Sequence, residues 1–514
     1  MRLSPAVATF AAAALILLAP GASASSGTTL VELTPAARCT QAAYLTAAGG
    51  RLVAAELGLY AVPNAAAPVV LSTLRAHGAL RLTAPNRSAG TLSVKDYSDP
   101  LVPTEWWRAV VGVGALTPPG PGKPVTIVDS GIDVTHPDYL NRPNTLTLNA
   151  QEPAGVGGEH GTGVGSVVGA PVNGLGLVGI YPEAVLRSWD AAKGAGTQLD
   201  TTEIVNGILA AARSGPGVVN LSLGADDKDL VIEQAIYQAV RLGTLVVAAS
   251  GNEGDAGNPL GYPASVSHVL TVGATDRANN VAAFSSRSHF VDLSAPGVGI
   301  PIATAIGKGW REGDGTSFAA PLVSGASAWV WTARPDLDAS QVFEVMRRSA
   351  VDIGAPGRDD AAGFGLLNVP AALVYPAPIP DPFEPNDDIE FVRSGGLYDN
   401  SVPPLTTPTH RTASIRARVD RFEDPHDVYR VWLPKQGRIT AALTANANLD
   451  LGLWRLGTVS VDERLVGKDR LAHATAPGTT ERLTFSNTGP GRYAFLAIGF
   501  PAGVSDATYA LRVS

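Results

Sequence analysis

Three short segments carry side chains that could act together on a carbonyl group. IVDSGIDVTHPD places Asp129 directly after an apolar run, GGEHGTGVG places His160 at the start of a Gly-rich run, and GDGTSFAAP places Ser317 before an Ala-rich run. A serine hydroxyl is a poor nucleophile at neutral pH. It needs an imidazole to take its proton, and a carboxylate to fix the tautomer of that imidazole and to stabilise its cation. The three residue types therefore predict nucleophilic acyl transfer.

The neighbours of these residues suit the same chemistry. Gly315 and Ala319 leave space around Ser317, and the N–H groups at the start of the helix expected there point toward developing negative charge. The segment AASGNEG places Asn252 in a Gly-bounded turn, from which its amide could donate to an oxyanion. A lone serine at a helix start is usually only a cap, so the acyl-transfer interpretation depends on the residues occurring together.

An α/β pattern runs from about Pro121 to Pro370 and would position these side chains. The Val-rich runs GKPVTIVDSG, GVVNLSLG, TLVVAASGN and SHVLTVGAT are typical of buried parallel strands. Amphipathic segments between them, such as TTEIVNGILAAARSG and DLVIEQAIYQAVRLG, predict helices that cover both faces of the sheet. Residues that follow parallel strands meet at one edge of the sheet, where ligands bind.

Two further folding units are expected on either side. Strand and helix patterns alternate over residues 25–98, which predicts a small α+β unit in which RLVAAELGLYAVP forms one strand. Residues 375–388 are rich in Pro and acidic residues and indicate a stiff linker. Residues 389–514 alternate between apolar and polar with frequent turn residues, which is typical of an all-β sandwich or jelly roll.

Composition and the N-terminus bound the functional class. The net charge of −8 argues against binding to nucleic acid or to an anionic membrane surface. Residues 1–24 have the form of a signal peptide that ends near Ala24, so we expect a secreted bacterial protein that is a monomer and has no membrane span after cleavage. A single cysteine, Cys39, excludes an internal disulfide and is expected to be a small buried residue.

The motifs resemble those of the subtilisin-like serine proteases (subtilases, peptidase family S8). DSGID, HGT, SGNEG and GTSFAAP occur in the family's order, with Asp129 and His160 separated by 31 positions, and His160 and Ser317 by 157. The resemblance covers roughly residues 100–374 and implies a role for each residue. Asp129 would orient the base, His160 would act as general base and then acid, Ser317 would be the nucleophile, and Asn252 would complete the oxyanion hole.

The same resemblance implies binding residues. Ser222, Leu223 and Gly224 in VNLSLGA match the family's substrate-binding strand, which pairs with an extended polypeptide through backbone hydrogen bonds. Asp138 and Asn173 match positions that hold a structural calcium ion in many subtilases. No cofactor is expected to be required for the chemistry.

Glycine occupies two positions after HGT at which many family members carry other residues. Gly163 stands where many have a second His, and Gly165 where many have Ala. Neither position takes part in the implied chemistry, so the expected activity is unchanged.

The flanking units also resemble known modules. Residues 25–98 resemble the family's pro-segment, which would act as an intramolecular inhibitor and be cut off near residues 90–100. DPFEPNDD followed by DVYRVWLP resembles the bacterial pre-peptidase C-terminal domain, a β-sandwich that is often trimmed from secreted proteases.

The sequence therefore predicts five regions: a signal peptide (1–24), a pro-segment (25–98), a subtilisin-like peptidase domain (99–374), a linker (375–388) and a β-sandwich (389–514). The predicted function is that of a secreted serine endopeptidase acting on proteins. Two alternatives stay open from the residues alone. The first is a latent protease scaffold that binds a surface through its β-sandwich, and the second is a hydrolase of small esters.

Overall fold

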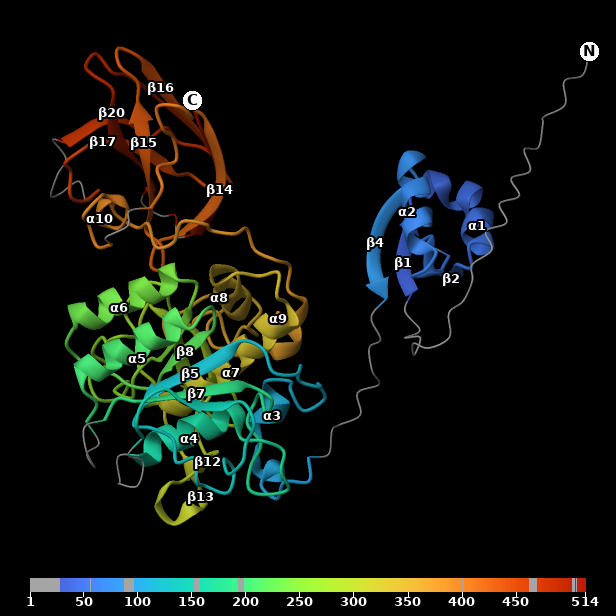
Figure 1. Ribbon diagram of the computed structural model, residues 1–514, viewed down its shortest axis with the longest axis vertical. Helices are drawn as coiled ribbons and strands as arrows, with labels where there is room; N and C mark the ends of the chain where they lie inside the picture. Colours follow the sequence, from blue (N-terminus) through green and yellow to red (C-terminus); the bar gives the residue numbers. More distant parts are fainter. Residues whose placement is uncertain are drawn as a thin grey trace, which may run out of the picture. The chain divides into compact units, whose positions relative to one another are not determined.

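We describe the protein from a computed structural model (Figure 1). The residues described are 28–55, 57–86, 97–151, 158–192, 198–398, 402–461, 469–501, 504 and 506–514. The predicted signal peptide and most of the region of the predicted maturation cut lie outside these residues. The chain divides into two compact units, Met1–Ser93 and Val94–Ser514.

The first unit is an antiparallel sheet with two helices. The sheet has the strand order β2-β3-β1-β4, and alternate residues of β1, such as Val31 and Leu33, pack with Leu45 and Leu74 of the helices. The segment predicted as one strand is instead the hairpin β2–β3, which turns near Gly58, whose φ of +64° favours glycine. Cys39 is exposed and not buried as expected. The elements are β1 (Thr28–Leu33), α1 (Arg38–Ala47), β2 (Arg51–Ala54), β3 (Leu59–Pro63), α2 (Ala67–Ala76) and β4 (Leu80–Asn86).

A seven-stranded sheet forms the centre of the second unit, with the strand order β11-β10-β9-β8-β5-β7-β6. Every neighbouring pair in this sheet is parallel, and all residues of β8, β9, β10 and β11 are buried. The predicted α/β class with a parallel sheet is therefore confirmed. The strands are β5 (Pro124–Asp129), β6 (Thr145–Thr147), β7 (Val185–Asp190), β8 (Val218–Leu221), β9 (Leu245–Ala249), β10 (Val269–Thr275) and β11 (Val291–Pro296).

Helices cover both faces of this sheet. Ile127 of β5 belongs to a core cluster with α4 (Gly158–Gly169) and α7 (Thr316–Ala333), whereas the next residue, Val128, packs against α5 (Thr201–Arg213) and α6 (Leu230–Arg241). Successive strand residues point to opposite faces, so a continuous apolar run supplies both cores. Figure 1 shows α5 and α6 lying side by side.

Further helices and short strands lie outside the seven-stranded sheet and its four covering helices. Asp338 and Gln341 form a capping box at the start of α8 (Ala339–Arg348). The elements are η2 (Val102–Thr104), α3 (Trp107–Val110), β12 (Ile300–Ala303), η3 (Ile306–Lys308), β13 (Trp310–Gly313), α8 (Ala339–Arg348) and α9 (Val369–Val374). We call the part of the chain that carries the seven-stranded sheet the α/β domain.

The C-terminal part is an antiparallel β-sandwich, which agrees with the predicted all-β class. One sheet has the order β14-β21-β16-β19 and the other β15-β20-β17-β18, and Val431, Ile439, Leu496 and Leu511 belong to the apolar cluster that both sheets contribute to. The strands are β14 (Ala413–Asp420), β15 (His426–Leu433), β16 (Arg438–Ala445), β17 (Asp450–Arg455), β18 (Arg470–Ala474), β19 (Thr480–Ser486), β20 (Arg492–Gly499) and β21 (Asp506–Val513).

The segment before the β-sandwich is packed against protein rather than extended through solvent. Asp381, Asn386 and Asp387 are buried in the stretch that was expected to act as a stiff linker, and helix α10 (Ile389–Val392) follows directly. Among the helices of the described ranges, none has both the length and the apolar composition needed to cross a membrane.

Candidate active site

Asp129 and His160 lie in direct contact. Asp129 is the last residue of β5, and His160 lies in the first turn of α4. The Nδ1 atom of His160 is 2.9 Å from Oδ1 and 3.0 Å from Oδ2 of Asp129. The carboxylate is buried, and its Oδ1 also accepts hydrogen bonds from the backbone N–H (2.7 Å) and hydroxyl (3.1 Å) of Ser130. These bonds fix the orientation of the carboxylate and, through it, that of the imidazole.

The Asp129 carboxylate also sets the protonation of His160. Burial by itself would lower the pKa of His160, but the charge of Asp129 and its hydrogen bond to the ring outweigh burial and raise the pKa above its ordinary value of 6.5. The His160 side chain is 40% exposed, whereas that of Asp129 is 1% exposed. The imidazole is therefore accessible from solvent while its partner is not.

Ser317 lies in the first turn of α7, two residues after Gly315, which is the N-cap of this helix. Its hydroxyl donates to the carbonyl oxygen of Ser222 at 3.4 Å, and no hydrogen bond joins it to His160 within the described residues. The ring of Phe318, the next residue, lies 5.9 Å from the His160 ring between centroids. The residue next to the nucleophile candidate therefore lies near the base, while the Ser317 hydroxyl itself bonds to the carbonyl of Ser222. Catalytic hydrogen bonds are often long or misaligned before substrate binds.

Asn252 lies on the other side of the Ser317 turn, in the loop after β9. Its side-chain oxygen accepts from the backbone N–H (2.9 Å) and the hydroxyl (3.0 Å) of Thr316. A Cβ added at Gly315 would lie 3.6 Å from both Nδ2 and Oδ1 of Asn252, so the amide group packs against the turn that precedes Ser317. The backbone N–H of Ser317 lies in the first turn of α7, where N–H groups lack intrahelical partners, and it could donate to an oxyanion bound beside Asn252.

Sequence reasoning missed a buried chain of hydrogen bonds behind the nucleophile. The Ser324 hydroxyl donates to Asn220 Oδ1 (2.8 Å), Asn220 Nδ2 donates to the Ser222 hydroxyl (2.9 Å), and that hydroxyl donates to the carbonyl oxygen of Ser317 (2.8 Å). All three donors are buried, so the chain fixes the end of β8 against α7. The one signal in the sequence was a polar residue, Asn220, within the apolar run VVNL.

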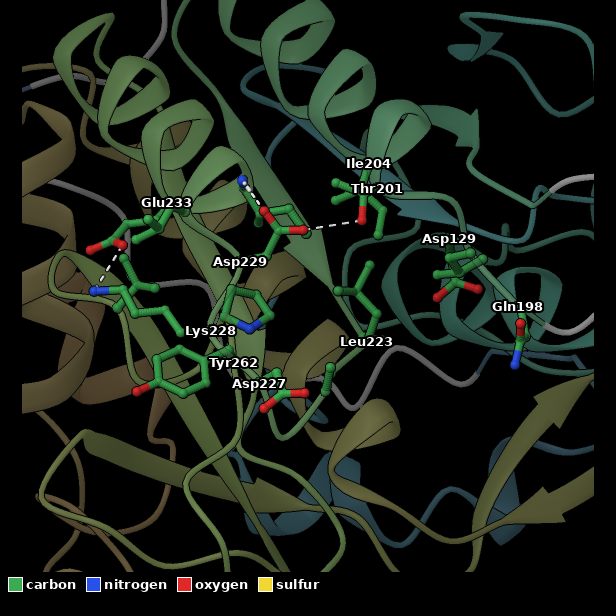
Figure 2. Close-up of a pocket in the computed structure, with 18 of the residues that line it drawn as sticks. Asp129, Gln198, Thr201, Ile204, Leu223, Asp227, Lys228, Asp229, Glu233 and Tyr262 are labelled. Atoms are coloured by element: carbon green, nitrogen blue, oxygen red, sulfur yellow. Dashed lines mark hydrogen bonds and ion pairs between the residues drawn. The ribbon is translucent and has the colours of Figure 1, made fainter. Parts of the chain in front are cut away.

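Two cavities flank the Ser222–Gly224 segment. The larger, of about 1020 Å³, is shown in Figure 2, and its lining residues include Asp129 and His160. Its walls include the apolar side chains of Ile204, Leu223 and Tyr262, and its rim carries charged residues, among them the Lys228–Glu233 ion pair at 2.9 Å. The smaller, of about 200 Å³, is lined by Ser222, Gly224, Asn252, Gly261 and Ser317, among others.

This arrangement suits an extended chain. Ser222, Leu223 and Gly224 follow β8 and lie outside its pairing with β5 and β9. Their backbone groups therefore border both cavities without belonging to the seven-stranded sheet. A polypeptide laid along them would place alternate side chains in pockets of different size.

Asp138 and Asn173, the predicted calcium ligands, lie close to a residue that the prediction missed, Asp99. Asp138 is buried and its Oδ2 accepts from the indole N–H of Trp310 at 2.5 Å, while Asp99 Oδ1 accepts from the backbone N–H of Asn173 at 3.0 Å. Asp138 Oδ1 and Asp99 Oδ2 are buried and have no hydrogen-bond partner within the described part of the chain. Burial raises the pKa of Asp138 to about 6, and the Trp310 hydrogen bond opposes that shift. Orphaned hard oxygen atoms of this kind fit a calcium ion.

Comparison with known proteins agrees with the geometry. The model of the subtilase family matches residues 120–365. Subtilisin Savinase from Lederbergia lenta is 36% identical over 255 residues, which covers 49% of this chain and 91% of that protein. Alkaline protease from Alkalihalobacillus alcalophilus is 36% identical over 255 residues, which covers 49% of this chain and 64% of that protein. The crystal structure of the psychrophilic subtilisin-like protease Apa1 from Pseudoalteromonas sp. AS-11 is 22% identical with a TM-score of 0.48, covering 52% of this chain and 97% of that one.

The fold and the sequence matches together define the class of protein. The protein is a serine-type endopeptidase, a hydrolase whose substrates are polypeptides. More particularly, the chain belongs to the subtilase family, peptidase family S8. These matches do not favour the alternative of a latent binding scaffold.

Proposed function

We propose that the protein is a secreted endopeptidase that cuts polypeptides through an acyl-enzyme formed on Ser317. The observation that carries the proposal is the pair of contacts at 2.9 and 3.0 Å between His160 Nδ1 and the buried Asp129 carboxylate, with the ring of Phe318, the residue after Ser317, 5.9 Å from the imidazole between centroids. Asp129 holds the Nδ1–H tautomer, so the lone pair of Nε2 is available as a base. A rotation about the Cα–Cβ bond of Ser317 would turn its hydroxyl from the Ser222 carbonyl toward the base.

The reaction then runs in two halves. His160 takes the hydroxyl proton as Ser317 Oγ attacks the scissile carbonyl, and the oxygen that becomes negative accepts hydrogen bonds from Asn252 Nδ2 and the backbone N–H of Ser317. His160 gives the same proton to the leaving amine when the C–N bond breaks. A water molecule enters, loses its proton to His160, and attacks the ester carbon, and the proton returns to Ser317 as the C–O bond breaks.

The substrate would be held as an added strand. In the proposal, Ser222, Leu223 and Gly224 pair with the backbone of the polypeptide, while the cavities of about 1020 and 200 Å³ on either side receive its side chains. Because the contacts are mainly to the backbone, many sequences would bind. A small ester would gain little from this surface, which favours polypeptides.

The first compact unit would act as a pro-segment, and the N-terminus as an export signal. The unit holds its own apolar core around Val31, Leu45 and Leu74, so it can form a folded inhibitor. The proposal is that it occupies the substrate strand of the same chain until it is cut off near residues 90–100. The signal-peptide pattern of residues 1–24 supports export.

The pH dependence of peptide hydrolysis tests the role of His160. Because only the neutral imidazole can take a proton, kcat/KM should fall as the pH drops through the pKa of His160. That pKa is raised by Asp129, so the acid limb should lie above pH 6.5. The measurement is kcat/KM on a four-residue peptide from pH 5 to 9.

Asp129→Asn serves as the matched variant, since it keeps the shape of the side chain but removes its charge. Its residual activity should be far lower, with the acid limb moved to lower pH. A flat profile in the wild type would contradict the assignment of His160 as the base.

We also propose a structural calcium ion at Asp138, with Asp99 and the loop of Asn173 contributing oxygen ligands. Calcium at 100 times its dissociation constant should stabilise the fold by about 2.7 kcal/mol, because the ion binds only the folded form. The melting temperature should therefore rise with calcium in the wild type, and part of that rise should be lost in Asp138→Asn. Asp360→Asn, which alters a carboxylate that is 67% exposed, is the control. An equal calcium response in both variants would remove this ion from the proposal.

A further inference from the structure

A cavity lies on the outer face of one sheet of the β-sandwich, and none of the residues that carry the proposed peptidase chemistry lines it. Leu451 and Leu453 of β17 belong to the apolar cluster between the two sheets, so the alternate residues Asp450, Gly452 and Trp454 point to the opposite face. There β17, β18, β20 and the start of β15 line a cavity of about 410 Å³. Binding sites for small molecules enclose about 300–1,000 Å³, so the cavity has room for such a ligand.

Two glycines on that face make room for the cavity. A Cβ added at Gly452 would lie 3.0 Å from Nε1 of Trp454, and one added at Gly499 would lie 2.8 Å from Cδ2 of His426. Neither glycine has a φ in the left-handed region, so the backbone alone would accept other residues. Glycine within a strand often marks the close approach of another group. Here a larger residue at either position would displace a ring that lines the cavity.

The cavity is lined by one buried donor and one buried acceptor that have no hydrogen-bond partner among the described residues. The donor is Nε1 of Trp454, a residue that is 3% exposed, and the acceptor is Oδ1 of Asp450. Residues 450 and 454 lie on the same face of β17, so both groups belong to one surface. Leaving buried polar groups unpaired is unfavourable. A ligand that accepts from the indole and donates to the carboxylate would satisfy both groups.

The charges around the cavity favour an uncharged ligand. Asp450 is negative, the guanidinium of Arg470 is positive and lies 5.8 Å from the centroid of the Trp454 ring, and His426 and His473 also line the cavity. Burial raises the pKa of Asp450, and the charge of His473 opposes that shift. A simple anion would meet Asp450, and a simple cation would meet Arg470. A hydroxyl group can both donate and accept, so neighbouring hydroxyls match this mixture of groups.

A metal ion matches the cavity less well than a ligand with hydroxyl groups. His426, Asp450 and His473 are not among the groups of three, within the described part of the chain, whose ligand atoms lie within 4.8 Å of one another. Phe500 and Trp454 add apolar surface to the walls. An ion would gain nothing from that surface, whereas the C–H groups of a sugar ring can be buried against it.

We propose that this cavity binds one sugar unit of a saccharide, with Asp450 accepting a hydrogen bond from one hydroxyl and Trp454 donating to another. The site goes beyond the proposed peptidase function, and neither depends on the other. The protein remains a peptidase in this proposal, which distinguishes it from a latent scaffold. The same chemistry fits a free oligosaccharide and a unit within an insoluble polysaccharide, so the experiment includes both.

Binding of saccharides to the full chain tests the site. The protein is inhibited with a serine-directed reagent to prevent autolysis, labelled with a fluorophore and applied to a printed array of oligosaccharides. It is also sedimented with cellulose and with chitin. Binding on the array is expected if the ligand is a free oligosaccharide, and binding only to cellulose or chitin if it is a polysaccharide. No binding to any of these probes would overturn the proposal.

Two variants each remove one hydrogen-bonding group from the cavity. Trp454→Phe and Asp450→Ala should each weaken binding at least tenfold, because a hydroxyl of the bound sugar loses its partner. Trp432→Phe is the matched control, because Trp432 lies in the same sheet, packs against Tyr493 at 5.0 Å between ring centroids and does not line the cavity. Asp360→Ala, which alters a carboxylate that is 67% exposed, is the control for Asp450. Equal affinity in all five proteins would overturn the proposal.

Asp450→Ala alone decides the question if Trp454→Phe does not fold, because Asp450 is only partly buried. The same variant tests the two competing classes of ligand. Inorganic phosphate and calcium chloride are titrated into it and into the wild type, and a calcium ion at Asp138 should be bound equally by both. A tenfold difference in affinity for phosphate, or one calcium ion fewer in the variant, would show that the cavity holds an ion and would overturn its assignment to a saccharide.

Peptide hydrolysis by the uninhibited wild type shows where the saccharide binds. A saturating saccharide should leave kcat/KM on a four-residue peptide unchanged, because no residue of the catalytic or substrate-binding segments lines the cavity. Competitive inhibition that persists in Asp450→Ala would place the saccharide in the peptidase cleft and overturn the proposed site. If the protein proved inactive on peptides, the binding measurements would still decide this proposal, so its failure and that of the peptidase function are distinguishable.

Discussion

Replacing Ser317 by alanine is expected to abolish peptide hydrolysis and self-processing. Without the hydroxyl no acyl-enzyme can form, and His160 has no proton to take. The loss in kcat should be about 10⁶-fold, a magnitude carried over from subtilisin, a relative of this chain, rather than calculated from this structure. The fold should be unaffected, because the Ser317 hydroxyl makes a single long hydrogen bond of 3.4 Å in the described residues.

Two measurements check this prediction. One is kcat/KM on a four-residue peptide, and the other is the mass of the secreted product, which should remain that of the uncut precursor. Ser340→Ala is the matched control, since its hydroxyl is exposed and, in the described part of the chain, bonds only to Asp338 Oδ1, at 2.9 Å. A Ser317→Ala protein that still matures and cuts peptide would refute the assignment of the nucleophile.

Replacing Arg347 by methionine is expected to destabilise the protein by about 3–5 kcal/mol, the usual cost of removing one partner from a buried ion pair. The guanidinium is 1% exposed and contacts Glu344 at 2.5 Å, Asp420 at 2.9 Å and Asp292 at 3.3 Å. It therefore joins α8 and β11 of the α/β domain to β14 of the β-sandwich. Methionine would leave these carboxylates buried without their main counter-charge.

The pH dependence of this effect follows from Glu344. Burial alone would raise its pKa, but Arg347, Arg418 and Arg348 hold it at about 2. A lowered carboxyl pKa contributes stability that is present above the unfolded-state value and lost as the pH falls toward 2. The difference between variant and wild type should therefore shrink between pH 5 and pH 2.

Urea denaturation at several pH values measures both effects. Arg393→Met, which alters a partly exposed arginine paired with Glu390 at 3.3 Å, should cost less than about 1 kcal/mol. If Arg347→Met were no more damaging than this control, the buried network would not be a main stabilising contact between the two domains.

The buried contacts of Arg347 differ from what the resemblance implied for the C-terminal domain. A β-sandwich that is often trimmed is expected to be joined to the rest of the protein only by an exposed linker. Here Arg347, His268 and the packed segment around Asp387 connect it to the α/β domain at several points. Its removal would expose buried charges, so we expect trimming to require that the contacts around Arg347 and His268 open first.

The sequence by itself determined the class of fold and the candidates for catalysis. Apolar runs such as VTIVD predict strands that are buried on both faces of a sheet, as β5 is in the structure. Asp129 and Asn252 could be singled out because they stand at or after the end of a strand, and His160 and Ser317 because they stand at the start of a helix.

Only the tertiary structure decided which side chains meet. His268 and Asp387 are separated by 119 positions and showed no shared pattern, yet the fold buries them in contact. No pattern in the sequence indicated that Asp99 lies beside the loop of Asn173. Equally, none indicated that the Ser317 hydroxyl points toward the carbonyl oxygen of Ser222. The physical reason is that periodicity records whether a residue is buried, whereas the partner of a buried polar group is set by long-range packing.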